Sequence, residues 1–206
     1  SLSELSASTG YYWRVRAERL EYSSACSNPR SFLSYPTRVS MQAARSFGAA
    51  EGRSDHRLVA LPGRSQRPLS EPVSGRPGMD WEAHGEEGAA QEDLVPYDGS
   101  SAFHFRPGTG FWLRGTEEWK VRGSVPSVPL SDDGTYTISV HDGWNVISNP
   151  FDLDVSWGAV EAANGGSLPP LWRFSGAFRQ TSIFFSARGG GAFYFFNRQD
   201  LDALQI

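Results

Sequence analysis

Residues 136–150 of this chain read YTISVHDGWNVISNP. The first part alternates apolar and polar side chains, and the last part is a short apolar run that ends at Pro150. Asp142-Gly143 lies between them, and an Asp-Gly pair between two strand patterns is a strong signal for a β-hairpin. Pro150 has no N–H to donate to a neighbouring strand, so it ends the run. The stretch therefore predicts a hairpin and, with it, an antiparallel β fold.

The composition supports a mainly β protein and excludes two classes of partner. The 206 residues include 13 Phe, 7 Tyr, 7 Trp, 22 Gly and 13 Pro, which is typical of short aromatic strands separated by turns. The net charge is −4, Lys120 is the only lysine and the arginines are spread through the chain, so no basic stripe is available for nucleic acid. No run of 18 apolar residues is present, which excludes a membrane-spanning helix. Cys26 is the only cysteine, so no disulfide can form within the chain.

Self-similarity within the chain indicates two related halves, about 57–115 and 143–198. Four pairs of segments recur in the same order: 57–62 with 145–150, Trp81 with Trp157, 94–99 with 171–176, and 108–113 with 190–195. Each half is expected to contain a strand stopped by proline, a short helix or turn that carries the tryptophan, a hairpin, and a glycine pair before an aromatic strand. In the second half, Asp154 can cap the helix and Asn164-Gly165 can end it.

The N-terminal region carries a separate strand pattern. Tyr11, Trp13, Val15 and Ala17 alternate with polar or charged residues, which predicts a strand with these four side chains on its buried face. A turn-rich stretch and a second short strand around Phe32 follow. This pattern resembles the last two strands of a fibronectin type III domain, an immunoglobulin-like fold of about 100 residues. The resemblance implies that residues 1–34 are the end of a domain whose beginning lies upstream.

The motifs around Gly143 and Gly110 also resemble a repeat module found near fibronectin-type domains in large secreted or cell-surface bacterial proteins. This resemblance covers about 56–206 and implies export and surface display. The fold class we expect is therefore mainly β, with a partial fibronectin type III hairpin and a two-halved antiparallel β module with short helices. The expected division is 1–34 for the hairpin, 35–56 for a linker, and 57–206 for the module.

The tryptophans are candidates both for the core and for stacking on sugar rings. Each large aromatic side chain buries 150–250 Å², which a module with few leucines and methionines needs, so burial is favoured for the group. Trp119 lies outside the repeat beside Glu117 and Glu118, and is expected to be the most exposed. If the chain binds sugar, the stacking residues we expect are Trp119, Trp112 and Trp172.

Other groups of residues give weaker indications of a metal site or a catalytic site. Asp152 and Asp154 offer carboxylates for Ca²⁺, but aspartate is also the ordinary residue of turns and caps, which we favour. The four histidines, His56, His84, His104 and His141, are far apart, so a zinc site would have to be assembled from distant positions. No G-x-S-x-G motif or phosphate-binding loop occurs. We therefore expect no catalytic residue, no metal ligand and no cofactor.

These observations favour a non-catalytic structural or adhesive module of a larger extracellular or cell-surface bacterial protein. The alternative is a carbohydrate-binding module accessory to a secreted hydrolase. A third reading, a hydrolase that uses Asp152, Asp154 and a histidine, requires these side chains to meet in one cleft. The expected partners are other domains of the same polypeptide and, on the binding reading, a polysaccharide or a surface protein.

Overall fold

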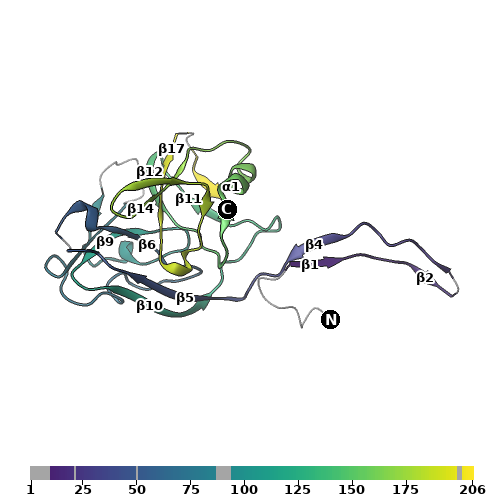
Figure 1. The fold of residues 1–206 in the computed structure, drawn as a ribbon, viewed down its shortest axis with the longest axis horizontal. Helices are drawn as coiled ribbons and strands as arrows, with labels where there is room; N and C mark the ends of the chain where they lie inside the picture. Colours follow the sequence, from purple (N-terminus) through teal and green to yellow (C-terminus); the bar gives the residue numbers. More distant parts are fainter. Residues whose placement is uncertain (1–9, 21, 50, 87–93, 199–200) are drawn as a thin grey trace. The chain divides into compact units, whose positions relative to one another are not determined.

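A computed structural model describes residues 10–20, 22–49, 51–86, 94–198 and 201–206 (Figure 1). The chain divides into two compact units, Ser1–Thr37 and Arg38–Ile206, which are described separately. The fold is mainly β, with antiparallel sheets and a single α-helix among the described residues, which confirms the expectation of a mainly β fold. None of the helices in the described ranges is long and apolar enough to span a membrane.

The first unit is a two-stranded ribbon. β1 (Gly10–Trp13) pairs with β4 (Arg30–Leu33), and β2 (Glu18–Arg19) pairs with β3 (Tyr22–Ser23). The second strand expected around Phe32 is therefore present. The expected burial of the β1 face is wrong, since Trp13 is 47 % exposed and Val15 is 57 % exposed. A two-stranded ribbon has no second layer of structure to cover one of its faces, which accounts for the exposure of Trp13 and Val15.

The second unit begins with β5 (Arg38–Arg45), which pairs along its whole length with β10 (Trp119–Pro126). Val39, Met41 and Ala43 are buried, and they alternate with exposed residues. The linker expected over 35–56 is therefore wrong for this stretch. The small and polar residues of 38–45 conceal a period of two, because only three of the eight side chains enter the core. The short 3₁₀ turn η1 (Arg53–Asp55) follows the strand.

Two four-stranded sheets form the centre of this unit, and both have the same topology. The first contains β6 (Arg57–Val59), β9 (Phe111–Gly115), β7 (Trp81–Gly85) and β8 (Val95–Pro96), in that spatial order. The second contains β12 (Gly143–Ile147), β17 (Phe193–Asn197), β14 (Leu171–Phe174) and β15 (Phe178–Thr181). In each sheet the strand that comes first in the sequence pairs with the strand that comes fourth, and this fourth strand also pairs with the second.

Matching hydrogen bonds join the two halves. The N–H of Ala60 donates to Gly190 O at 3.2 Å, and the N–H of Ser148 donates to Gly108 O at 2.8 Å. Gly108 and Gly190 occupy the same position before β9 and β17, with φ values of 82° and 76°. A Cβ atom built on Gly108 would lie 2.0 Å from Ile138 Cγ2, and one on Gly190 would lie 2.6 Å from Ala43 Cβ. Both positions therefore require glycine for the backbone conformation and for close packing.

Only two of the four matched segment pairs fall on equivalent strands. Segments 57–62 and 145–150 contain the first strands, and segments 108–113 and 190–195 lead into the fourth. Trp81 lies in β7, whereas Trp157 begins the helix α1 (Trp157–Ala163). Segments 94–99 and 171–176 contain β8 and β14, which are not equivalent. The two tryptophans are core residues in both halves and do not mark the same position.

The hairpin expected at residues 136–150 is also wrong. β11 (Thr137–Ser139) pairs with β18 (Ala203–Gln205), whereas β12 pairs with β17. Gly143 does turn the chain, with a φ of 84°, and Asn145 holds the turn through hydrogen bonds to the N–H and carbonyl of His141. The turn thus moves the chain from one sheet to another, because the aromatic strand β17 offers β12 a five-residue ladder.

The remaining short elements connect these sheets. β13 (Val155–Ser156) pairs with β16 (Ile183–Phe184), and the 3₁₀ turns η2 (Ser101–Phe103) and η3 (Ala187–Gly189) precede the glycine positions described above. The α1 helix is capped by the hydroxyl of Ser156, which accepts from Ala159 N at 3.1 Å, so the cap expected at Asp154 is wrong. Asn164 and Gly165 end the helix, as the sequence indicates.

Candidate functional site

The two sheets carry different chemistry at equivalent positions of one face. We call this the outer face: it holds the side chains of Trp112 and Tyr194, which alternate with the fully buried Leu113 and Phe195. The strand registers match residues of the first half to residues of the second. The matched pairs are Trp112 with Tyr194, His84 with Trp172, His56 with Trp144, Arg114 with Phe196 and Glu86 with Phe174. The outer face is thus aromatic in the second half and largely polar in the first.

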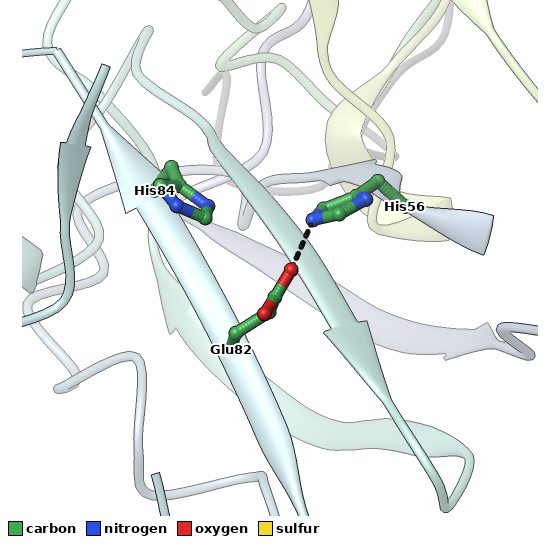
Figure 2. A group of neighbouring side chains, drawn as sticks. All are labelled: His56, Glu82 and His84. Atoms are coloured by element: carbon green, nitrogen blue, oxygen red, sulfur yellow. Dashed lines mark ion pairs between the residues drawn. The ribbon is translucent and has the colours of Figure 1, made fainter. Parts of the chain in front are cut away.

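The polar part of the outer face, in the first half, contains a cluster of His56, Glu82 and His84 (Figure 2). One ligand-type atom from each residue lies within 4.8 Å of the other two. Glu82 and His84 point to the same side of β7, because they are two residues apart on a strand. His56 lies directly before β6, and its Nε2 atom is 3.0 Å from Glu82 Oε1. Arg114 Nη2 lies 2.9 Å from the other oxygen of Glu82.

The electrostatics of the cluster act on His56. Burial lowers the pKa of His56 below its usual value, and the charges of Arg114 and His84 lower it further. The carboxylate of Glu82 and the hydrogen bond to Arg53 O act in the opposite direction, but burial prevails. The Nδ1 atom of His56 lies 3.3 Å from Arg53 O. Both ring nitrogens of this histidine therefore face oxygen atoms.

An apolar pocket of about 410 Å³ opens beside the cluster. The histidines form one side of it, and aromatic and aliphatic side chains form the rest. Its lining consists of Arg53, His56, His84, Leu94, Trp112, Phe174 and Phe178. Trp112 lies at the junction, since its ring centroid is 6.4 Å from that of His56 and 5.0 Å from that of Phe174.

The aromatic part of the outer face extends from this pocket across the second sheet. Trp144 stacks on Tyr194 with a centroid distance of 4.7 Å, and Phe178 stacks on the same ring at 5.6 Å. We call these three residues the aromatic strip. Trp144 is 37 % exposed and Phe178 is 47 % exposed. Burial, together with the nearby charge of Glu86, raises the pKa of Tyr194 to about 12, so its phenol stays neutral at physiological pH.

Glu86 and His141 form a second titratable pair near Tyr194. Glu86 Oε2 lies 3.6 Å from His141 Nε2, and the N–H of Val146 donates to the same carboxyl group. Burial raises the pKa of Glu86 to about 7, against the opposing effects of Val146 and His141. The carboxyl group is thus partly protonated at neutral pH, where an exposed glutamate would be fully ionised.

The residues expected to stack on sugar are placed differently from one another. Trp119 is 1 % exposed and packs beside Phe105, so its expected exposure is wrong. Its place on β10 turns the indole into the core, while Lys120 faces outward. Trp112 is 8 % exposed but lines the pocket, and Trp172 is partly buried opposite Tyr194. Of these three, only Trp112 lines the pocket.

The carboxylates proposed for Ca²⁺ have other partners. Asp154 Oδ1 accepts a hydrogen bond from Ser186 N at 2.8 Å, and Asp152 Oδ1 lies 3.5 Å from Arg188 Nη1. No histidine, cysteine or third carboxylate joins them in a metal-type cluster within the described part of the chain. The convergence with a histidine that a hydrolase would need is therefore absent from the described residues.

The sequence predicts neither the histidine cluster nor the aromatic strip. Glu82-x-His84 is the usable signal, because a strand places these two side chains on one face. His56 could be added only once β6 was known to lie one strand away from β7. For Trp144 and Tyr194 the sequence favours the core over a stacking surface, since nothing in it distinguishes the two faces of an aromatic strand.

Comparison with protein-family models, with curated proteins and with solved structures gave no match.

Proposed function

We propose that this chain is a non-catalytic, adhesive module of a larger extracellular or cell-surface protein, and that it binds carbohydrate at the aromatic strip. The observation that supports this function is the partial exposure of Trp144 and Phe178 on either side of Tyr194. Large aromatic side chains usually hide most of their surface in a core. A purely structural spacer gains nothing from leaving an indole and a phenyl ring in water.

The aromatic strip, with polar side chains near it and beside the apolar pocket, suits the two kinds of surface that a sugar ring presents. Aromatic carbons supply contact for the C–H faces of sugar rings, and polar groups lie beside them. Arg53, His56 and His84 line the pocket, and Gln180 is exposed on β15. The phenol of Tyr194 is held neutral and offers no activated nucleophile. The strip therefore supplies contact area and hydrogen bonds, which suits binding.

Most of the other indoles of the second unit are buried and offer little surface to a ligand. Trp81, Trp112 and Trp157 are at most 8 % exposed, so they serve mainly as core. Carbohydrate contact is accordingly assigned to Trp144, Phe178 and the pocket wall.

A panel of polysaccharides titrated against the chain, followed by tryptophan fluorescence, tests this function. We expect a saturable blue shift, because a bound sugar would exclude water from Trp144. Phe178→Ala should weaken binding by about 2 kcal/mol, or roughly 30-fold, as for a central interface aromatic. Phe185→Ala is the matched control, since Phe185 is 38 % exposed and stacks on Phe193 instead of the strip.

Trp144→Ala should remove the fluorescence response, whereas Trp13→Ala, which removes an exposed indole of the first unit, should leave it intact. Absence of saturable binding to every polysaccharide would reject carbohydrate as the ligand. Binding that is equally weakened by Phe178→Ala and Phe185→Ala would place the contact elsewhere.

A further inference from the structure

We propose that His56, Glu82 and His84 form a binding site for a divalent transition-metal ion, with Zn²⁺ as the physiological type. Two imidazoles and one carboxylate converge from β7 and from the residue before β6 (Figure 2). His56 and His84 also line the pocket beside the aromatic strip, but the metal site does not depend on the carbohydrate proposal, because its geometry and its test involve no sugar.

The distances are close to those of a metal site. Zinc binds histidine nitrogen and carboxylate oxygen at roughly 2.0–2.2 Å, which places neighbouring ligand atoms about 3.3 Å apart in a tetrahedron. His56 Nε2 and Glu82 Oε1 are 3.0 Å apart. The widest separation in the cluster is at most 4.8 Å. Closing it needs a movement of roughly 1.5 Å, which side-chain rotation supplies without moving the strands.

The hydrogen bonding of His56 at its other ring nitrogen also suits a metal ligand. Its Nδ1 faces Arg53 O at 3.3 Å and its Nε2 faces Glu82 Oε1 at 3.0 Å. A protonated imidazole donates to both oxygens, whereas a neutral imidazole has one N–H and leaves the other nitrogen free to bind a metal ion. With Nδ1–H donated to the backbone carbonyl, the Nε2 lone pair is directed at the cluster. A metal-bound histidine commonly has this arrangement, in which a carbonyl fixes the ring and its tautomer.

Arg114 positions the third ligand. Its guanidinium holds one oxygen of Glu82 at 2.9 Å and leaves the other oxygen toward His56. Glu82 is thereby expected to bind the metal through a single oxygen, with Arg114 as a positioning residue. The positive charge of Arg114 also repels a cation, so we expect weaker binding than in a closed site with four protein ligands.

The ligand types select the metal. Imidazole nitrogens suit Zn²⁺, Cu²⁺, Ni²⁺ and Co²⁺, whereas Ca²⁺ and Mg²⁺ require mainly oxygen ligands. Three protein ligands leave a coordination position for water or for a ligand atom. Both histidines line the 410 Å³ pocket, so that position is accessible from it.

Titration of the untagged 206-residue chain with Co²⁺ and Zn²⁺ tests the site. We expect one Co²⁺ ion per chain, with visible absorption bands of four- or five-coordinate cobalt that Zn²⁺ abolishes and that excess Ca²⁺ leaves unchanged. His84→Gln and Glu82→Gln should each weaken Zn²⁺ binding at least 100-fold, since losing a ligand exceeds the roughly 10- to 100-fold effect of second-shell changes.

His104→Gln is the matched control, because His104 lies outside the cluster. It should bind Co²⁺ as the natural sequence does. Near-ultraviolet circular dichroism of each variant establishes that the fold is retained, and Zn²⁺ should raise the thermal midpoint of the natural chain but not that of folded Glu82→Gln. Equal Zn²⁺ affinity for the natural chain and folded Glu82→Gln would overturn the proposal. Octahedral cobalt bands that disappear in His104→Gln would also overturn it, because the ion would then be bound at His104 and not at the cluster. In either case the cluster would be a histidine–carboxylate ion pair and no more.

Discussion

Glu86 should make the stability of the module fall as the pH rises from about 4.5 to 7. Burial raises the pKa of Glu86 from 4.5 in the unfolded chain to about 7 in the folded protein. Between these values the folded state keeps a proton that the unfolded state has released. Since one pKa unit corresponds to about 1.36 kcal/mol, the free energy of unfolding should decrease by about 3 kcal/mol across this window. The contribution is complete below pH 4.5 and is lost as the pH passes 7.

The structure explains why the carboxyl group is costly to ionise. The Glu86 side chain is 18 % exposed, and its partner His141 Nε2 is 3.6 Å away, beyond a good hydrogen bond. The N–H of Val146 favours the ionised form but does not offset burial. The equivalent position in the second half is Phe174, so the fold accommodates a fully apolar side chain there. Glu86→Gln keeps the shape of the protonated acid and removes the charge.

Urea unfolding of the natural chain and Glu86→Gln at pH 5, 6, 7 and 8 measures the effect. We expect similar stability at pH 5 and a variant that is more stable by about 3 kcal/mol at pH 8. The lowered pKa of His56 gives a slope of the opposite sign, but it is present in both proteins and cancels in the difference. Asp98 and Asp133, whose pKa values are lowered by hydrogen bonds, act below pH 4 and outside this window. Parallel curves for the two proteins from pH 5 to 8 would refute the reasoning.

Two further predictions concern the fold. Asn149→Ala should lower the free energy of unfolding by about 3–5 kcal/mol, because the fully buried amide donates to Leu153 O and Phe184 O and these carbonyls would lose their partner. Gln180→Ala removes an exposed amide and should change the free energy of unfolding by less than about 0.5 kcal/mol. Met41→Ala should cost about 2–5 kcal/mol if β5 is a core strand, and the neighbouring Gln42→Ala almost nothing. Urea unfolding measures both pairs, and equal effects within either pair would contradict the assigned burial.

The sequence predicted the class of fold better than the pairing of its strands. Alternation and turn residues are local signals, and they placed most strands of the two sheets. Pairing depends on which distant strand offers the longer ladder. Nothing within 136–150 reveals that β12 pairs with β17 instead of β11. β5 was missed for a related reason, since alanine, serine and glutamine weaken the alternation that a core strand usually shows.

The candidate site was predictable only in part. Local sequence joins Glu82 to His84, but His56 approaches them through the order of strands in the sheet. Trp119 was expected outside because two glutamates precede it. Those glutamates are exposed, and the strand that begins at Trp119 turns the indole to the opposite side. Charged neighbours in sequence therefore say little about a side chain on a strand.

The difference between the two halves is itself an argument for where the module functions. Some matched positions hold buried apolar residues in both halves, such as Leu113 with Phe195 and Val59 with Ile147 on the inner side, because both members of each pair fill a core. On the outer face the same topology holds His56 in one half and Trp144 in the other. Packing does not demand this change, since each side chain is partly accessible. The partly accessible positions of the outer face are thus free to differ between the halves, and it is there that both the proposed metal site and the proposed sugar contact lie, joined through Trp112.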